Sequence, residues 1–367
     1  MYDSCDACLR RALLVAHLAP RIAGLLGSGE RRATGLLSLP DDDLIAAVAG
    51  RRLDAVLDFL DSLDLRSERD RLMETGLLVV CLHSPSYPPL LRDLADPPAL
   101  LFGSGGAEAL AKVAEEPAVT VVGTRRASPY GTEVAYALGR GLGAAGVPVV
   151  SGLALGIDGT AHRGCLDGGG VPIAVVAGGP DVVYPRRHRS LHERVREAGL
   201  VVSELPPRTE PYRWSFPARN RIMAGLARMT LVVEAADPSG SLITAEFAKD
   251  LGRSVAAVPG RVTSTVARGT NNLLKDGATP IGGTEDILDE LFGVAVRPVP
   301  ALAELPPTPD EPLLRAVLEA ADRRDSVEAV AAATGGSVAE TRAALGRLEA
   351  DGYLVRRDLG GWERTAR

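Results

Sequence analysis

Short, strongly apolar runs recur from about residue 77 to residue 258 and alternate with segments long enough to form a helix. The runs are almost continuously hydrophobic, which is typical of strands that are covered on both faces. They span Leu77–Leu82, Val119–Val122, Val147–Val150, Val171–Val176, Leu200–Val202, Leu231–Val233 and Val255–Val258. This alternation predicts an α/β fold with a Rossmann-like, doubly wound, mostly parallel sheet over residues 76–293.

The residues before this region follow a different pattern. Apolar residues recur at spacings of three and four in Arg11–Leu18, Asp42–Ala49 and Leu53–Leu63, as they do in amphipathic helices. Pro40-Asp41 is a start signal for the second of these helices. We expect residues 1–75 to form a small helical (SAM-like) domain.

Proline marks the end of the sheet region, because residues 294–312 contain six prolines and read as a linker. Three helical patterns and two short strand-like runs follow. They cover Leu313–Ala321, Ser326–Thr334, Ser337–Asp351, Tyr353–Val355 and Trp362–Arg364. This order predicts a winged-helix-like domain over residues 313–367, with Ala339–Leu348 as its recognition helix. From Glu311 on there are nine basic and ten acidic residues, a balance that favours contact with a protein over contact with duplex DNA.

Glycine follows most of the predicted strands at their carboxyl ends, the edge where open parallel sheets bind ligands. Gly123 and Thr124 follow the second strand, and Ser151-Gly152 follows the third. Glycine there lets a ligand approach backbone N–H groups closely. Arg125 and Arg126 come next in the first of these loops, and their guanidinium groups match the geometry of phosphate. These residues together predict a phosphate-binding edge.

The same loops argue against the common nucleotide cofactors. The loop after the second strand reads Gly123-Thr124-Arg125-Arg126-Ala127-Ser128 rather than Gly-x-Gly-x-x-Gly, and the third strand does not end in an acid. NAD and FAD are therefore not expected. The chain also lacks the Gly-Lys-Ser or Gly-Lys-Thr of a P-loop. We expect a protein without cofactors and without catalytic residues.

Positive charge is concentrated in one segment of an acidic chain. The whole sequence has a net charge of −6, whereas residues 186–228 hold ten arginines, four glutamates and no aspartate, a net charge of +6. Arginines and aromatic residues interleave there, as in proteins that bind single strands by charge along the backbone and by stacking on bases. The residues that carry this prediction are Arg186, Arg187, Phe216, Arg219 and Arg221. Trp214 and Phe216 also fit a role in core packing.

Four cysteines, Cys5, Cys8, Cys81 and Cys165, are too few for a disulfide framework and indicate a reducing compartment. Cys5-x-x-Cys8 has no second cysteine pair and no nearby histidine doublet, so no metal site is predicted. The first residues lack the basic and apolar regions of a signal peptide, and no apolar run reaches the length of a membrane span. We expect a cytoplasmic protein that does not bind membranes.

Two residue patterns in the sequence also allow a catalytic or metal-binding role. Asp158 and His162 are four residues apart on a predicted helix, either as an acid–base or metal-binding pair, or as a helix cap and its hydrogen-bond partner. The stretch Ser239–Glu246 loosely resembles the glycine-rich loop and glutamate of the lysine-decarboxylase-like phosphoribohydrolases. The alternative function is therefore a Rossmann-fold nucleotide hydrolase that uses Glu246 and Arg221.

A series of motifs lies between about residues 75 and 285, in a specific order and at specific spacings. The motifs are Ser86–Leu90, Pro97–Phe102, Val119–Arg126, Ser151–Asp158, Asp181–Pro185, Phe216–Gly225, Ser239–Ala245, Ala257–Gly260 and Gly269–Asn271. Together they resemble the DNA-processing protein A family, also called DprA or Smf. Leu155 departs from the pattern, because that position is often arginine in the family.

The resemblance implies a protein that binds and protects single-stranded DNA and loads a RecA-type recombinase during natural transformation. It also implies a homodimer formed through the Rossmann-like domain. Carried over by position, the implied roles are phosphate binding for Gly123, Thr124 and Arg125, a positive pocket for Arg186 or Arg187, nucleotide contacts for Asn220 and Arg221, and a peripheral charge for Lys275.

Overall fold

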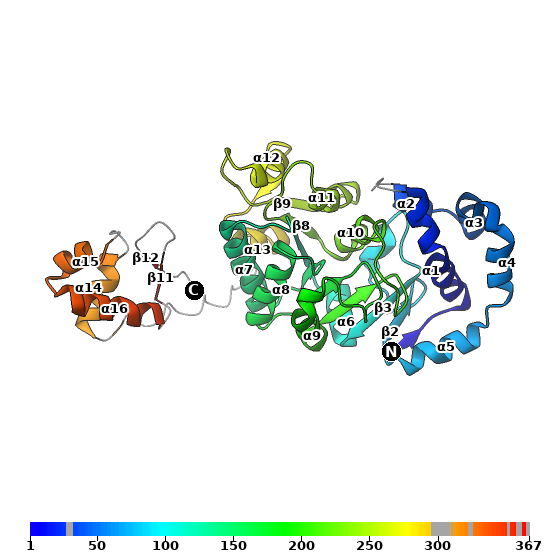
Figure 1. The fold of residues 1–367 in the computed structure, drawn as a ribbon, viewed down its shortest axis with the longest axis horizontal. Coiled ribbons are helices and arrows are strands. Elements are labelled where there is room, and N and C mark those ends of the chain that lie inside the picture. Colours follow the sequence, from blue (N-terminus) through cyan, green and yellow to red (C-terminus); the bar gives the residue numbers. More distant parts are fainter. Residues whose placement is uncertain are drawn as a thin grey trace. The chain divides into compact units, whose positions relative to one another are not determined.

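The computed structural model describes residues 1–26, 32–294, 309, 311–321, 326–350, 353–356 and 362–364. The chain divides into two compact units, residues 1–296 and residues 297–367 (Figure 1). The predicted linker, residues 294–312, lies largely outside the described residues.

A ten-stranded sheet forms the centre of the first unit, in the order β1-β2-β3-β7-β6-β5-β4-β8-β9-β10 (Figure 1). The strands are β1 (Tyr2–Asp3), β2 (Leu78–Cys81), β3 (Leu100–Gly105), β4 (Val119–Val122), β5 (Val149–Ser151), β6 (Pro172–Val175), β7 (Leu200–Ser203), β8 (Met229–Val232), β9 (Ser254–Ala257) and β10 (Thr279–Pro280). β3 runs antiparallel to both of its neighbours, and the other neighbouring pairs are parallel. The predicted Rossmann-like, mostly parallel sheet is confirmed.

Three strands of this sheet do not appear in the pattern of apolar runs. β3 contains Gly103-Ser104-Gly105, which interrupts its apolar stretch. β1 and β10 pair over two residues each, too short a length for a hydrophobic pattern to show. All three lie outside the regular alternation of strand and helix that made the other seven recognisable.

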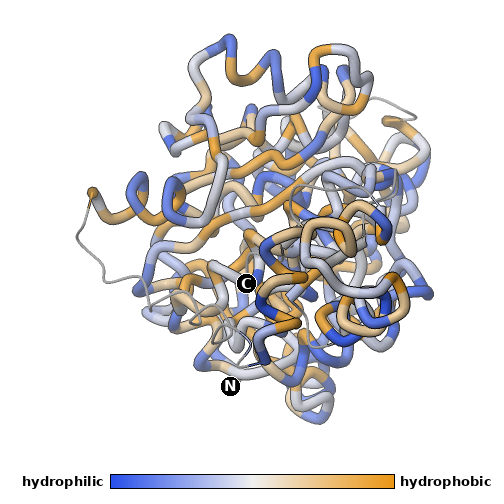
Figure 2. The backbone as a smooth tube through the Cα atoms, turned by 90° about the vertical axis from the view of Figure 1, so that its left-hand side faces the viewer, coloured by the Kyte–Doolittle hydropathy of each residue, from blue (hydrophilic) through white to orange (hydrophobic). Residues whose placement is uncertain are grey.

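Helices cover both faces of the sheet. Val119 and Val121 of β4 point to the face covered by α7, α8 and α13, whereas Val122 points to the face of α10 and α11. The helices of this region are α6 (Ala107–Glu115), α7 (Pro129–Ala144), α8 (Ile157–Asp167), α9 (Arg189–Ala198), α10 (Ser215–Leu226), α11 (Gly240–Asp250), α12 (Arg268–Lys275) and α13 (Thr284–Phe292). Figure 2 shows apolar colouring along the strands of the interior and polar colouring mainly on outer turns. Among the described helices, none is long and apolar enough to cross a lipid bilayer.

The N-terminal helices belong to the same compact unit as the sheet. They are α1 (Asp6–Leu26), α2 (Arg32–Leu37), α3 (Asp41–Ala49), α4 (Leu53–Asp61) and α5 (Leu65–Glu74). The apolar faces of α1 to α4 share a core with Leu205, Trp214 and Ala218, and the indole Nε1 of Trp214 donates to the carbonyl of Ala19 at 3.0 Å. β1 joins the edge of the sheet beside β2. The described residues before β2 are therefore mainly helical, and they pack on the sheet region.

The second unit holds α14 (Pro312–Ala321), α15 (Val327–Thr334) and α16 (Val338–Ala350), followed by the antiparallel strands β11 (Leu354–Arg356) and β12 (Trp362–Arg364). Its core consists of apolar residues from all three helices, together with Leu354 and Trp362. This is the element order expected of a winged helix.

Candidate nucleic-acid interface

The order of the strands reverses direction at β4. The chain passes from β4 to β5, β6 and β7 on one side, and later adds β8, β9 and β10 on the other side. The loops that follow β4, β5 and β8 diverge at such a point and leave a crevice, where open α/β sheets bind ligands. Two adjoining pockets lie at this edge, and both have Arg125, Ala154, Phe216 and Arg219 in their walls.

The larger of the two, which we call the switch pocket, has a volume of about 360 Å³, within the usual range for small-ligand sites. It is lined by Val122, Gly123, Thr124, Arg125, Ala154, Asp158, Phe216, Pro217, Arg219, Asn220, Met223, Ser239, Gly240, Ser241, Ile243 and Thr244. Its walls come from the β4–α7 loop, the turn before α8, one face of α10 and the start of α11.

The loop between β4 and α7 is fixed at its base by Glu234, a buried residue that follows β8. The carboxylate of Glu234 accepts hydrogen bonds from the backbone N–H and the hydroxyl of Ser128, at 2.9 and 2.7 Å. Its carbonyl accepts from the N–H of Thr124 at 2.7 Å. Glycine is required at position 123, because a Cβ there would lie 2.5 Å from the Ile157 side chain. The loop thus presents the exposed side chain of Arg125 from a rigid base.

The start of α11 forms the opposite wall of the switch pocket. Ser239 caps this eleven-residue helix, and its hydroxyl accepts from the N–H of Ser241. The side-chain amide of Asn220 donates to the carbonyl of Gly240 at 3.2 Å and so ties α10 to this turn. Because the N-terminus of a helix carries partial positive charge, this wall favours an anion.

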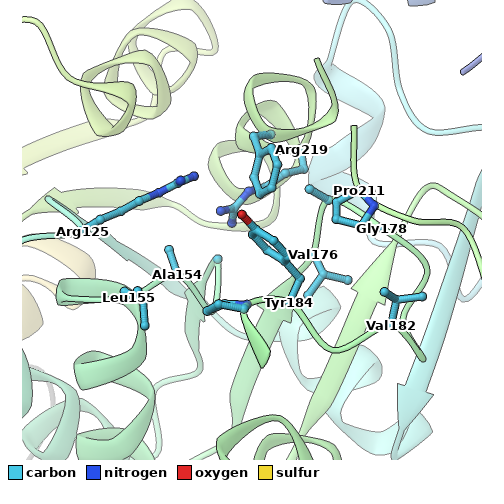
Figure 3. Close-up of a pocket in the computed structure, with 13 residues that line it drawn as sticks. Arg125, Ala154, Leu155, Val176, Gly178, Val182, Tyr184, Pro211 and Arg219 are labelled. Atoms are coloured by element: carbon cyan, nitrogen blue, oxygen red, sulfur yellow. The ribbon is translucent and has the colours of Figure 1, made fainter. Parts of the chain in front are cut away.

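The smaller pocket, which we call the aromatic pocket, contains a ring pair and a guanidinium group (Figure 3). The rings of Tyr184 and Phe216 are tilted by 56° with centroids 5.4 Å apart, and the guanidinium carbon of Arg125 lies 5.2 Å from the Phe216 centroid. Tyr184 is 49% exposed. Partly exposed rings beside an arginine form a surface on which an unpaired base can stack.

Arg219 lies between the two pockets and is 5% exposed. Its Nη1 donates to the carbonyl of Val175 at 3.0 Å, and its Nη2 lies 4.0 Å from the carboxylate of Asp158. Burial lowers the pKa of Arg219 to about 10, so the side chain remains a cation at neutral pH. Figure 3 shows Arg125, Tyr184 and Arg219 directed toward one another. A poorly screened cation in this position attracts an anion strongly.

Arg221 occupies the opposite face of α10, because two positions on a helix differ by about 200°. Its guanidinium contacts both oxygens of Glu204, at 2.8 and 2.7 Å, and lies 2.9 Å from the carboxylate of Asp96. The residue is 1% exposed. Its side chain is therefore committed to these carboxylates and has no surface to offer DNA, in contrast to the nucleotide contact expected from the sequence.

The remaining predicted residues lie outside the pocket walls. Four of them are exposed basic side chains, namely Arg126, Arg186, Arg187 and Lys275. Ser151 is buried, and its hydroxyl donates to the carbonyl of Val121 at 2.6 Å. Ser151 thus stabilises the strand end, while its neighbour Gly152 lines the aromatic pocket.

Asp158 and His162 form neither an acid–base or metal-binding pair nor a helix cap with its hydrogen-bond partner. The carboxylate of Asp158 accepts from the N–H of Gly152 at 3.2 Å and faces Arg219, rather than capping α8. His162 is fully buried, and burial lowers its pKa to about 3, so its imidazole is neutral. Arg221 is held by Glu204 and Asp96, which makes it unavailable as a partner for Glu246.

Tyr184, Gly240 and Ser241 line the pockets but were not among the predicted site residues. Tyr184 directly precedes Pro185-Arg186-Arg187, the same aromatic–arginine signal that identified Phe216. Gly240 and Ser241 follow the strand β8 and open a helix, so the rule that predicted Gly123 and Gly152 also applies to them.

Comparison with known families identifies the family to which the chain belongs. A family model described as DNA recombination-mediator protein A matches residues 78–292, more than half of the chain. The chain belongs to the DprA family. The DprA family consists of DNA-binding recombination mediators and not of enzymes, so the nucleotide-hydrolase alternative is not supported.

Relatives in the DprA family match over most of the chain. A putative DNA processing protein DprA from Mycobacterium tuberculosis is 41% identical over 279 residues, which is 74% of this chain and 70% of that protein. DprA from Bacillus subtilis is 40% identical over 59% of this chain and 72% of its own length. The crystal structure of DprA from Streptococcus pneumoniae superposes with a TM-score of 0.62 at 31% identity, covering 78% of this chain and 96% of that one. A structure of DprA from Helicobacter pylori, described for its single-stranded DNA binding mode, has a TM-score of 0.52 at 29% identity and covers 59% of this chain and 97% of that one.

Proposed function

We propose that this chain is a recombination mediator that binds single-stranded DNA across the switch pocket and the aromatic pocket. The observation that carries the proposal is the placement of Arg125 and Arg219 beside a partly exposed aromatic pair, at the switch point of a mostly parallel sheet. The single-stranded DNA binding mode described for the H. pylori relative supports the same ligand.

The two pockets suit different parts of a nucleotide. In the switch pocket, Gly123 and Thr124 allow a phosphate to approach the backbone, Arg125 and Arg219 supply charge, and the start of α11 adds its dipole. In the aromatic pocket, Tyr184 and Phe216 offer faces to a base. A base inside a duplex is already stacked on its neighbours, so this arrangement favours a single strand over a double strand.

The exposed arginines extend this surface. Arg126 follows Arg125 directly, and Arg186 and Arg187 follow Tyr184. We assign to these three side chains, and to Lys275, contacts with phosphates of neighbouring nucleotides rather than with the bound base. Such contacts fix the position of a strand without reading its sequence.

The first test is fluorescence anisotropy of a labelled oligonucleotide, single-stranded and double-stranded, over a series of salt concentrations. We expect preference for the single strand and a linear fall of log affinity with log salt, with a slope of about 0.7 for each phosphate neutralised. Equal, weak binding of both forms would contradict the proposal.

Gly152 provides a sharper test, because it makes room for Arg219. A Cβ at position 152 would lie 1.5 Å from Nη1 of Arg219, so Gly152→Ala must displace that guanidinium. We expect affinity for the single strand to fall about tenfold, the loss of one charge-assisted contact. Gly24→Ala is the control, because a Cβ there meets nothing within 4 Å. Unchanged binding by Gly152→Ala would exclude Arg219 from the interface.

The role in recombination follows from the family. We propose that the chain acts in the cytoplasm, protects incoming single-stranded DNA and loads a RecA-type recombinase onto it during natural transformation. The test uses single strands already covered by a single-strand-binding protein, on which a recombinase assembles slowly. Addition of this chain should raise the DNA-dependent ATPase rate of the recombinase. An unchanged rate would remove loading from the proposal while leaving DNA binding intact.

We further propose that the chain forms a homodimer through the Rossmann-like domain. Light scattering should give twice the mass of one chain for the full-length protein and for residues 1–296, which form a compact unit. A dimeric full-length protein with a monomeric 1–296 fragment would instead place the interface in the C-terminal unit.

The C-terminal unit is proposed to contact protein rather than duplex DNA. The exposed residues of α16 include Glu340 and Glu349 as well as Arg342, and Arg347 is paired with Glu311 at 2.8 Å. A helix that enters the major groove would be expected to present a more uniform positive charge. Deletion of residues 308–367 should leave DNA affinity unchanged, and a loss of affinity would favour the DNA-reading alternative.

A further inference from the structure

Three cysteines and one histidine converge at the edge of the sheet, away from the two pockets. Cys5 and Cys8 lie at the start of α1, Cys81 is the last residue of β2, and His83 follows two residues later. Their ligand atoms all lie within 4.8 Å of one another. The pairing of β1 with β2 brings these distant parts of the chain together. The sequence suggested no metal site, because the partners of Cys5-x-x-Cys8 lie in a distant part of the chain.

The distances within this cluster fit a four-coordinate metal ion. The Nδ1 atom of His83 lies 3.4 Å from the sulfur of Cys5 and 3.3 Å from that of Cys8. Zinc bonds of usual length to sulfur and nitrogen, at tetrahedral angles, place the two ligand atoms about 3.6 Å apart. The four ligand atoms are thus already close to the positions that zinc requires.

Two of the four ligands, Cys8 and Cys81, have apolar surroundings. Cys8 and Cys81 are buried among Leu9, Leu72, Val79, Leu100 and Phe102, and all three thiols are free. Cys5 directly precedes α1, and Cys8 lies in its first turn. A bound cation offsets the cost of forming buried thiolates.

We propose that Cys5, Cys8, Cys81 and His83 bind one Zn²⁺ ion as a closed structural site. Three sulfurs and one imidazole nitrogen are ligands typical of structural zinc, and four protein ligands leave no open position for catalysis. The site connects the first turn of α1 to the end of β2. It would therefore add to the apolar contacts that hold the N-terminal helices on the sheet, where β1 pairs over only two residues.

Metal analysis of the full chain tests this proposal. The protein is purified with a reducing agent, without chelator, and its zinc content is measured by inductively coupled plasma mass spectrometry. We expect about one zinc per chain, and replacement by Co²⁺ should give the visible bands of tetrahedral cobalt with thiolate ligands. Cys8→Ser should lose most of the zinc. Cys165→Ala is the matched control, because that buried cysteine lies in a different core, and it should retain a full complement.

A second variant guards against misfolding, since Cys8 is buried. His83 is exposed, so His83→Ala should fold normally, yet release zinc to a chromogenic chelator at least about tenfold more readily than the native chain. Removal of zinc should also lower the melting temperature of the native chain. Single-stranded DNA affinity at a temperature where the chain stays folded should not change, because β3 and β7 separate β2 from β6, β5 and β4, the strands that pocket residues directly follow.

Three results would overturn the proposal. The first is native protein that carries little zinc although its four thiols are reduced and titrate as free. The second is an oxidised Cys5–Cys8 pair as the stable form, which would indicate redox chemistry instead. The third is an iron–sulfur absorption spectrum with stoichiometric iron in place of zinc.

Discussion

Replacing Arg125 with alanine is expected to weaken single-stranded DNA binding by about 10- to 100-fold, the largest effect of any exposed side chain. Arg125 is shared by both pockets and lies 5.2 Å from the ring of Phe216. Its loss removes a charge-assisted phosphate contact and one member of the stacking surface, together worth about 1.5–3 kcal/mol. Anisotropy with a labelled single strand measures the change.

The control for Arg125→Ala is Arg196→Ala, an exposed arginine on α9 outside the pockets. Both variants change the net charge equally, so a general effect of charge would weaken binding in both. The slope of log affinity against log salt should fall by about 0.7 for Arg125→Ala and should stay the same for Arg196→Ala. Equal losses in the two variants would contradict a local role for Arg125.

Arg221→Leu is expected to destabilise the fold by about 3–5 kcal/mol, because it leaves the buried Asp96 and the half-buried Glu204 without the cation that compensates their charges. Both carboxylates lie within 2.9 Å of the guanidinium, which is 1% exposed. Urea denaturation measures the free energy of unfolding. Arg213→Leu is the control, since Arg213 is exposed just before the same helix and its loss should cost little.

The pH dependence of Arg221→Leu follows from Asp96. Burial already raises the pKa of the Asp96 carboxyl in the native chain, and removal of the neighbouring cation raises it further. When the pKa of a carboxyl group is higher in the folded state than in the unfolded state, the free energy of unfolding falls as the pH rises through the interval between these two pKa values. The deficit of the variant should therefore be largest at neutral pH and should shrink as the pH falls toward about 5.

The same variant separates two roles for Arg221. Where Arg221→Leu is still folded, its affinity for single-stranded DNA should equal that of the native chain. A large loss of affinity in the folded variant would restore the nucleotide contact that the sequence suggested. An unchanged free energy of unfolding would contradict the structural role.

Most strands of the sheet and several residues of the pocket walls can be predicted from the sequence. Apolar runs locate seven strands, and the rule that ligands bind at their carboxyl ends leads directly to Gly123, Arg125 and Gly152. The different roles of Arg219 and Arg221 could not be predicted from the sequence. Both lie in one arginine-rich stretch, and only the phase of α10 separates the residue that faces the pockets from the one that faces Glu204.

Contacts between distant segments account for the other differences. Composition marks the N-terminal helices as distinct from the sheet, but their apolar residues pack on Leu205 and Trp214, contacts that no local pattern records. The metal cluster depends on the parallel pairing of β1 with β2. A two-residue strand has too little pattern to reveal that pairing.

The hydrogen bond between Trp214 and Ala19 predicts a consequence of removing the N-terminal helices from this chain. A fragment that starts at β2 would lack the N-terminal helices that cover Leu205, Trp214 and Ala218. These apolar residues, at and before the start of α10, would then form an exposed patch. Such a fragment would tend to aggregate through that patch. A relative without these N-terminal helices would need polar side chains at the corresponding positions, so the residue at position 214 should indicate whether a relative has the helical segment.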